Sequence, residues 1–209
     1  MKVIAVSQRV VMRTEQERCD ALDQQWAVLL ERAGIFPVLL PNRLLAVEAF
    51  FETLSVTGLL LTGGNDVAFL QTESAAPERD AVESLALKYA LEKAYPVLGI
   101  CRGAQFLVHF FGGNLRPVEH HAGTVHALLA QPFRFGLLPS AVRSFHNFGF
   151  LEADLPSVFK SIATAEDGVV EAIQHSTQTI AGIMWHPERE PEFLDQSLSM
   201  LRKIFLQRV

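Results

Sequence analysis

Val97-Leu98-Gly99-Ile100-Cys101-Arg102-Gly103-Ala104-Gln105 holds a cysteine between two glycines in the pattern G-x-C-x-G. The apolar residues before the cysteine predict a buried strand, and a helical pattern follows it as far as Gly112-Gly113. This is the order of a nucleophile elbow with cysteine in place of serine. A tight strand-to-helix turn leaves no room for neighbouring side chains, which accounts for both glycines. The segment predicts an α/β fold with Cys101 at the carboxyl edge of a sheet.

Short apolar runs alternate with helical patterns before this segment, as in the strand-crossover-strand units of a parallel sheet. Strands are expected over residues 3–6, 36–40, 58–61 and 97–100. One helix is expected over about residues 79–93, and another where apolar residues recur at helical spacing before Gly34: Cys19, Leu22, Trp26, Leu29 and Leu30.

The second half of the chain has shorter extended segments, which predict antiparallel additions to the sheet. They lie near Phe133 and over residues 142–145, 158–165, 169–174 and 179–185, and a helix is expected over residues 190–207. Since no linker or internal repeat interrupts the chain, a single domain over residues 1–209 is expected.

Composition excludes several classes of function. Hydrophobic residues make up 49% and charged residues 20% of the 209 positions, which is ordinary for a globular domain. The net charge of −5 comes without a long basic run, so we expect no nucleic-acid partner. With no apolar run long enough for a signal peptide or a bilayer span, we expect a cytoplasmic protein with no membrane partner.

Cys101 is the candidate nucleophile, because a helix N-terminus carries partial positive charge that favours a thiolate. The alternative is a buried structural cysteine, which is the interpretation we favour for Cys19. The glycines and the strand-to-helix context reverse that preference for Cys101. Two cysteines form neither a disulfide framework nor a CxxC metal pair, and no cofactor is predicted.

His186 is the best candidate for the base that a thiol nucleophile needs, because it follows the apolar run 180–185 and would emerge at a strand end. Pro187 keeps the chain extended, so Glu188 can approach the same imidazole and fix its tautomer. His186 and Glu188 could instead be metal ligands, but no third ligand is spaced convincingly near them.

His120, His121 and His126 form a rival metal cluster. They fall in a loop-like segment after Pro117, where polar side chains are commonly solvated. A contact with the substrate and simple exposure both stay open for them, and no metal site is predicted.

Thr62-Gly63-Gly64-Asn65-Asp66 follows the third predicted strand, so its backbone amides would lie at the same sheet edge as Cys101. Paired glycines let amides approach an oxyanion closely, although the same residues suit a plain turn. Arg9 follows the first strand and would also face this edge. There it could hold a phosphate or a carboxylate bidentately, or be an ordinary surface arginine.

Four segments together resemble the class I glutamine amidotransferase superfamily, and in the family's order: 61–67, 99–105, 144–146 and Trp185-His186-Pro187-Glu188. Within it, the chain is most similar to the free-standing gamma-glutamyl hydrolases, including gamma-glutamyl-aminobutyrate hydrolases. The resemblance implies a flavodoxin-like three-layer sandwich with a mostly parallel sheet. It also implies a gamma-glutamyl thioester on Cys101.

The resemblance further implies an oxyanion hole from the backbone amides of Gly64 and Arg102. Substrate contacts are implied for Gln105, Ser144, Phe145, His146 and Asp66. One motif departs from the aminobutyrate hydrolases, which tend to have Asn-Ser-x-His-His-Gln where this chain has residues 143–148. The opening 7–10, with Arg18, Asp20 and Asp23, is instead similar to hydrolases acting on a gamma-glutamyl nucleotide amidate.

The sequence therefore predicts a cysteine hydrolase that cleaves a small-molecule gamma-glutamyl amide and releases glutamate. The alternative is a glutaminase subunit that delivers ammonia to a synthetase partner with the same triad. A non-catalytic binding module would require a broken triad. The leaving amine, the pathway and the oligomeric state, including a homodimer, stay open.

Overall fold

The computed structural model describes residues 2–207, except the side chain of residue 193. Residues 1, 208 and 209, which the predicted domain includes, lie outside the described residues. The centre is an eight-stranded sheet in the order β4-β1-β5-β6-β14-β13-β12-β9. The five strands from β4 to β14 are parallel. In sheet order they are β4 (Ile35–Leu40), β1 (Lys2–Ser7), β5 (Val56–Leu61), β6 (Val97–Ile100) and β14 (Ile180–Ile183). The remaining three strands pair antiparallel. They are β13 (Val170–His175), β12 (Phe159–Thr164) and β9 (Leu129–Ala130).

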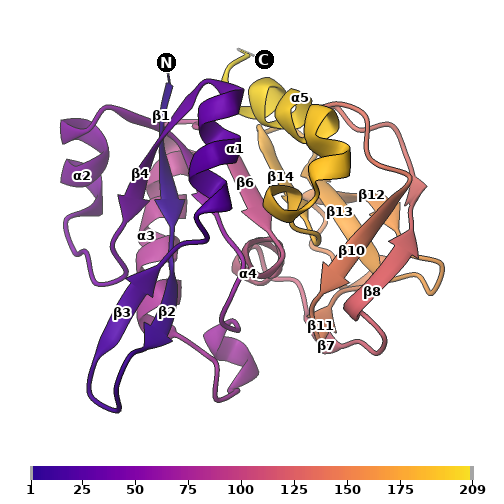
Figure 1. Cartoon of the computed structure of the whole chain (residues 1–209), viewed down its shortest axis with the longest axis horizontal. Helices are drawn as coiled ribbons and strands as arrows, with labels where there is room; N and C mark the ends of the chain where they lie inside the picture. The colour runs from indigo at the N-terminus through magenta and orange to yellow at the C-terminus, as the bar shows by residue number, and fades with distance from the viewer. Residues whose placement is uncertain (1, 208–209) are drawn as a thin grey trace.

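Helices cover both faces of this sheet, as Figure 1 shows. On one face lie α1 (Gln25–Ala33) and α5 (Leu194–Phe205), and on the other α2 (Val47–Thr53), α3 (Pro77–Glu92) and α4 (Arg102–Phe110). Leu59 and Leu61 of β5 pack into the core under α2, α3 and α4, whereas Leu60 packs under α1 and α5. This alternation follows from the period of two in a strand and gives two hydrophobic cores. The expected three-layer sandwich of the flavodoxin-like fold is confirmed.

Within residues 2–207, three short pairs of strands lie outside the main sheet. They are β2 (Arg9–Met12) with β3 (Arg18–Ala21), β8 (Ala122–Ala127) with β10 (Ala141–Phe145), and β7 (Arg116–Pro117) with β11 (Phe148–Gly149). Single turns of 3-10 helix are found at Ala68–Leu70, Glu152–Asp154, Pro187–Arg189 and Pro191–Phe193.

The predicted start of the first helix is wrong. Cys19 lies in β3 and Leu22 precedes α1, which begins only at Gln25. The reason is a tertiary contact: the side chain of Asn65 accepts from the backbone N–H of Val10 at 2.7 Å and donates to its carbonyl at 2.9 Å. A side-chain amide thus ties the hairpin β2–β3 to a distant loop, and the helical spacing of Cys19 is coincidental.

The predicted second half is correct in part. Strands β12 and β13 are antiparallel as expected, but β14, within the predicted 179–185, pairs parallel with β6 and thereby brings its end beside Cys101. Residues 142–145 form β10 in a separate two-stranded sheet. The extended segment near Phe133 is not a strand; Phe133 packs against the core under α1 and α5. Helix α2 was not expected from the sequence.

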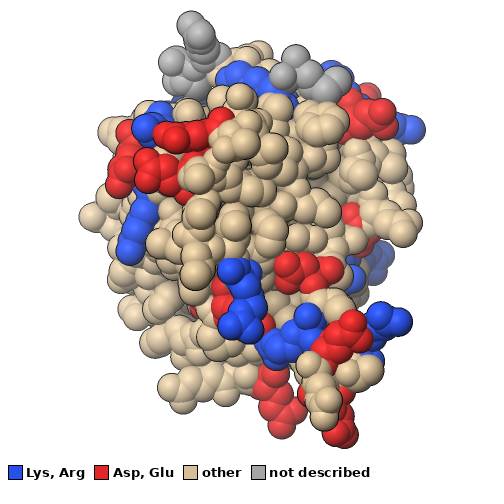
Figure 2. All heavy atoms as spheres, turned by 90° about the vertical axis from the view of Figure 1, so that its left-hand side faces the viewer, with Lys and Arg blue, Asp and Glu red and all other residues tan. Residues whose placement is uncertain are grey.

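No helix within residues 2–207 is both long enough and apolar enough to cross a bilayer. Figure 2 shows the face of the molecule beside edge strand β4. Charged side chains of both signs gather in its upper and lower parts, where they are mixed. This face therefore shows no continuous basic surface of the kind that a polyanion requires.

Candidate active site

Cys101 lies at the junction of β6 and α4 in a backbone conformation that L-residues rarely adopt. Its φ is 51° and its ψ is −107°, and its N–H donates to the carbonyl of Ile183 at 2.7 Å. A Cβ on Gly99 would lie 2.6 Å from the backbone of Gly103, and one on Gly103 would lie 2.1 Å from the carbonyl oxygen of Leu61. Both glycines are therefore required on steric grounds, as predicted, and the strain is the kind found at functional sites.

His186 follows β14 and presents its ring beside the same junction. Its Nδ1 lies 2.8 Å from Oε1 of Glu188, and both side chains are buried. A Cβ built on Gly63 would lie 3.4 Å from Nε2 of His186 and 3.5 Å from Cβ of Cys101. Nε2 of His186 and the side chain of Cys101 therefore both lie next to Gly63, while the carboxylate of Glu188 holds Nδ1.

The surroundings of His186 favour the protonated imidazole. Burial lowers its pKa, but the interactions with Cys101 and Glu188 outweigh burial and raise the pKa to about 9. At neutral pH the ring therefore carries a proton that it can donate. An imidazole that is held by a carboxylate and lies beside a cysteine sulfur is the arrangement that nucleophilic catalysis needs.

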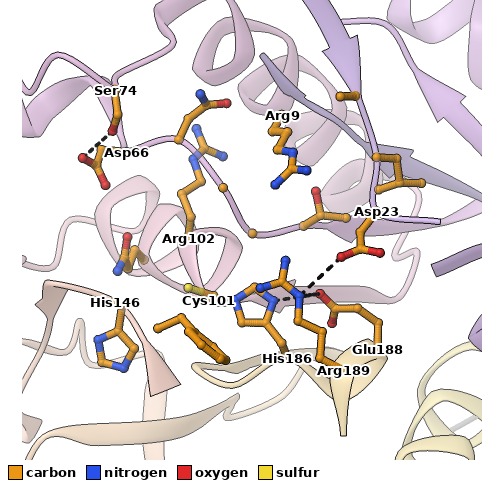
Figure 3. A pocket seen from close by; sticks show the side chains of 18 of the residues that line it. Arg9, Asp23, Asp66, Ser74, Cys101, Arg102, His146, His186, Glu188 and Arg189 are labelled. Atoms are coloured by element: carbon orange, nitrogen blue, oxygen red, sulfur yellow. Dashed lines mark hydrogen bonds and ion pairs between the residues drawn. The ribbon is translucent and has the colours of Figure 1, made fainter. Parts of the chain in front are cut away.

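A cavity of about 320 Å³ opens above Cys101, whose own residue is only 6% exposed. All of the predicted site residues except Ser144 line it: Arg9, Gly64, Asp66, Cys101, Arg102, Gln105, Phe145, His146, His186 and Glu188. Figure 3 shows several of their side chains converging from separate elements. Ser144 instead points its hydroxyl at the buried carboxylate of Glu171, at 3.2 Å. The side chain of Ser144 is therefore not placed to contact a ligand in the cavity.

The glycine loop after β5 is braced from behind by Arg79, a residue of α3 that sequence reasoning missed. Its guanidinium donates to the carbonyl oxygens of Thr62 at 2.6 Å, Gly63 at 3.1 Å and Gly64 at 2.6 Å. Its Nε pairs with Glu83 at 2.8 Å, and both side chains are fully buried. Burial lowers the pKa of Arg79 to about 10, so it stays charged at neutral pH. The Arg79/Glu83 spacing of four on one helix face was the available signal.

Arg102, the first residue of α4, turns its side chain into the same ionic network. It pairs with Asp80 and Glu83 of α3. Burial would raise the pKa of Glu83, but Arg102 and Arg79 lower it overall, so the carboxylate stays ionised. With its side chain committed to these pairs, the group that Arg102 offers at the helix N-terminus is its backbone N–H.

The segment that contains His121 is solvated only in part, because His120 is exposed but His121 is not. His121 is buried, and its ring nitrogens face Glu171 at 3.1 Å and Asp167 at 2.9 Å, while His126 lies in β8 and stacks on it. Burial lowers the pKa of His121, but the two carboxylates raise it overall. The rival metal cluster of His120, His121 and His126 is therefore wrong as a set of ligands.

A different triplet has spacing suitable for a metal ion: His121, His146 and Glu171, whose ligand atoms lie within 4.8 Å of one another. Nε2 of His146 lies 3.4 Å from Oε1 of Glu171. Because Glu171 also accepts from Ser144 and contacts His121, its oxygens already have partners. The oxygens of Glu171 are thus engaged without an ion, whereas both ring nitrogens of His146 are buried without a hydrogen-bond partner in the described residues.

Other cavity residues were not predicted from the sequence. Asp23 and Trp26 reach it from the region of α1, and Arg189 reaches it from the 3-10 turn after His186. Nε of Arg189 lies 3.4 Å from Asp23 and 3.6 Å from Glu188. Only the position of Arg189 just after the histidine motif could have indicated its role.

The chain is similar to known proteins along most of its length. The family model described as peptidase C26 matches residues 2–135 and 118–188. Gamma-glutamyl-CDP-amidate hydrolase of Campylobacter jejuni is 32% identical over 191 residues, 90% of each chain. A glutamine-hydrolyzing GMP synthase subunit of Thermoplasma acidophilum is 30% identical, over 80% of this chain and 78% of that protein. The crystal structure of a glutamine amidotransferase from Thermotoga maritima has a TM-score of 0.74 at 16% identity, covering 99% of both chains.

Proposed function

Since the chain belongs to the peptidase C26 family, which is class I glutamine amidotransferase-like, we propose that it hydrolyses gamma-glutamyl amides with Cys101 as nucleophile. The product is glutamate together with a free amine. The observation that carries the proposal is a buried His186–Glu188 pair, 2.8 Å apart, beside a strained cysteine at the floor of a cavity. Each group has the chemical character that its step requires.

The first step forms a covalent intermediate. The sulfur of Cys101 attacks the gamma-carbonyl carbon, and the negative charge that develops on oxygen is stabilised by the backbone N–H groups of Gly64 and Arg102. The tetrahedral intermediate collapses as the C–N bond breaks, and the imidazolium of His186 gives its proton to the leaving nitrogen. A gamma-glutamyl thioester remains on Cys101.

The second step is hydrolysis of the thioester. His186, now neutral, takes a proton from a water molecule that attacks the same carbonyl carbon, and the C–S bond breaks. Glu188 stabilises the imidazolium that forms again, as an orienting carboxylate does in a catalytic triad. Gln105, Phe145, His146 and Asp66 line the cavity and are the candidate contacts for the glutamyl group.

A substrate panel tests the proposal. We expect glutamate release from gamma-glutamyl amides of polyamine, aminobutyrate and nucleotide phosphoramidate, and loss of turnover in Cys101→Ala with substrate binding retained. Cys19→Ala is the matched control, because Cys19 lies in β3 outside the cavity and should keep full activity. Turnover retained in Cys101→Ala would refute the assignment of the nucleophile.

A glutaminase subunit is the second candidate, and the similarity to the GMP synthase subunit of Thermoplasma acidophilum favours it specifically. The same triad would release ammonia from glutamine for a synthetase partner. We favour the free-standing hydrolase because the relative that aligns over 90% of each chain is named a gamma-glutamyl-CDP-amidate hydrolase. Weak cleavage of glutamine alone that rises when a synthetase is added would favour the glutaminase.

A further inference from the structure

The cavity contains one arginine whose charge is not balanced by any side chain in the described residues. Arg9 pairs with no described carboxylate, and its Nε is buried without a hydrogen-bond partner. The neighbouring charges are already engaged, Arg189 with Asp23, Arg102 with Asp80 and Glu83, and Glu188 with His186. Because buried donors normally have an acceptor, the orphaned group indicates that a ligand supplies one.

Arg9 is held in place by the hairpin that carries it. It begins β2 and pairs with Ala21 of β3, and the next residue, Val10, is fixed through both backbone groups by the side chain of Asn65. A side chain anchored in this way loses less freedom on binding an anion than one on a free loop.

The stem of Arg9 lies against the glycine loop on the side of the catalytic histidine. A Cβ on Gly64 would lie 3.0 Å from Cδ of Arg9, while one on the adjacent Gly63 would lie 2.6 Å from Cε1 of His186. Figure 3 shows Arg9 on the same side of Cys101 as His186 and Glu188, with Asp66 and His146 on the other side. The cavity thus has two halves about the nucleophile.

The half beside His186 receives the leaving amine, because the imidazolium must donate its proton to that nitrogen. Arg9 then faces the substituent on the nitrogen. In a phosphoramidate, phosphorus is bonded directly to this nitrogen, so anionic oxygens lie two bonds from it. A guanidinium binds such oxygens bidentately. The carboxylate of an aminoalkanoate would lie several bonds further away.

On the basis of the proposed function, we propose that Arg9 binds a phosphoryl anion attached to the scissile nitrogen. The preferred substrates are then gamma-glutamyl phosphoramidates. In this reaction the C–N bond breaks while the N–P bond stays intact. The phosphoramidate leaves with the proton from His186, and water completes the release of glutamate from Cys101.

The test compares two substrates with the same glutamyl half. One is a gamma-glutamyl phosphoramidate, and the other is a gamma-glutamyl anilide, whose leaving group is uncharged. We expect Arg9→Met to lower the ratio of kcat/KM for the phosphoramidate to kcat/KM for the anilide by about 10- to 100-fold. This is the loss expected for a charge-assisted pair of hydrogen bonds. Arg9→Lys, which keeps the charge without the fork, should be intermediate. Arg13→Met is the control: Arg13 follows β2, and its side chain is 75% exposed, so the ratio should equal that of the wild type.

Four outcomes would overturn the inference. An unchanged ratio in Arg9→Met means that Arg9 does not bind the phosphoryl group, and an equal loss with both substrates means that it binds the glutamyl half. If the wild type cleaves neither substrate, the proposed function fails and this inference fails with it. Should Arg9→Met not fold, the wild type still decides: free phosphoramidate must inhibit anilide cleavage competitively, and a lack of inhibition would contradict the proposal.

Discussion

Arg79 donates a hydrogen bond from Nη1 to the carbonyl oxygen of Gly64 at 2.6 Å, and a second to that of Gly63 at 3.1 Å. In a trans peptide the carbonyl and the following N–H point in opposite directions. Holding the Gly63 carbonyl toward α3 therefore turns the N–H of Gly64 toward the cavity. Under the proposed mechanism, Arg79 is a positioning residue for the oxyanion hole.

Replacing Arg79 by lysine should lower kcat by about 100-fold, close to the loss of one oxyanion donor, and change KM little. Lysine keeps the charge beside Glu83 but cannot hold three carbonyls as the guanidinium fork does. Steady-state kinetics on a gamma-glutamyl amide measure both constants. Arg116→Lys is the control, because Arg116 pairs with Asp154 outside the cavity. A lower melting temperature with wild-type kcat would mean that Arg79 serves only stability.

Gly63→Ala should inactivate the enzyme without unfolding it. The new Cβ would lie 2.6 Å from Cε1 of His186, a side chain that can rotate away, and a shift of about 1 Å in a catalytic group can cost about 10²-fold in rate. Gly103→Ala meets backbone instead, 2.1 Å from the carbonyl of Leu61, so it should destabilise the fold by about 1–3 kcal/mol or more. Urea unfolding and kcat, measured on both variants, separate the two effects. Full activity in Gly63→Ala would contradict this close approach of the ring to the glycine.

The segments that carry the proposed triad could be recognised in the sequence because each is local. Cys101 with its glycines, and His186 with Glu188, carry their chemistry within a few residues, and parallel strands bring their ends to one edge. The predicted strands of the first half rest on similarly local apolar runs. The other residues that the sequence indicated line the same cavity, apart from Ser144, whose side chain faces Glu171.

What could not be predicted depends on contacts between distant residues. The hairpin β2–β3 is fixed by Asn65, 55 residues after Val10, and the bracing of the glycine loop comes from Arg79 on another element. His121 looked solvated because the carboxylate that receives it, Glu171, is 50 residues away. Periodicity and composition carry no information about such partners.

The imidazole of His186 should titrate with a midpoint near pH 9, because its interactions with Cys101 and Glu188 outweigh burial. Removing either partner removes one of the interactions that raise the pKa, so Cys101→Ala and Glu188→Gln should both move the midpoint downward. NMR titration of the ring measures it in each protein. A wild-type midpoint at or below pH 6.5 would show that the ring is neutral at rest.

The same pKa makes a prediction about stability. Since the pKa of His186 is raised on folding, its contribution to the free energy of unfolding is fully present below pH 6.5 and is lost as the pH rises through about 9. Urea unfolding of the wild type should therefore show a decline over this window that is smaller in His186→Gln. Identical declines in the two proteins would contradict the assignment of this titration to His186.

Glu171→Gln should destabilise the protein by about 1–3 kcal/mol at neutral pH, the cost of leaving buried hydrogen-bonding groups without the acceptor that they contact. Burial raises the pKa of Glu171, but His121 and His146 lower it overall, so its stabilisation is present above pH 4.5 and is lost as the pH falls below that. The difference between wild type and variant should shrink accordingly in acid. Glu166→Gln, on the exposed turn nearby, is the control and should be neutral. Because the oxygens of Glu171 already contact His121 and accept from Ser144, a chelator should leave the melting temperature unchanged. A stoichiometric metal whose removal lowers it would establish an ion site there instead.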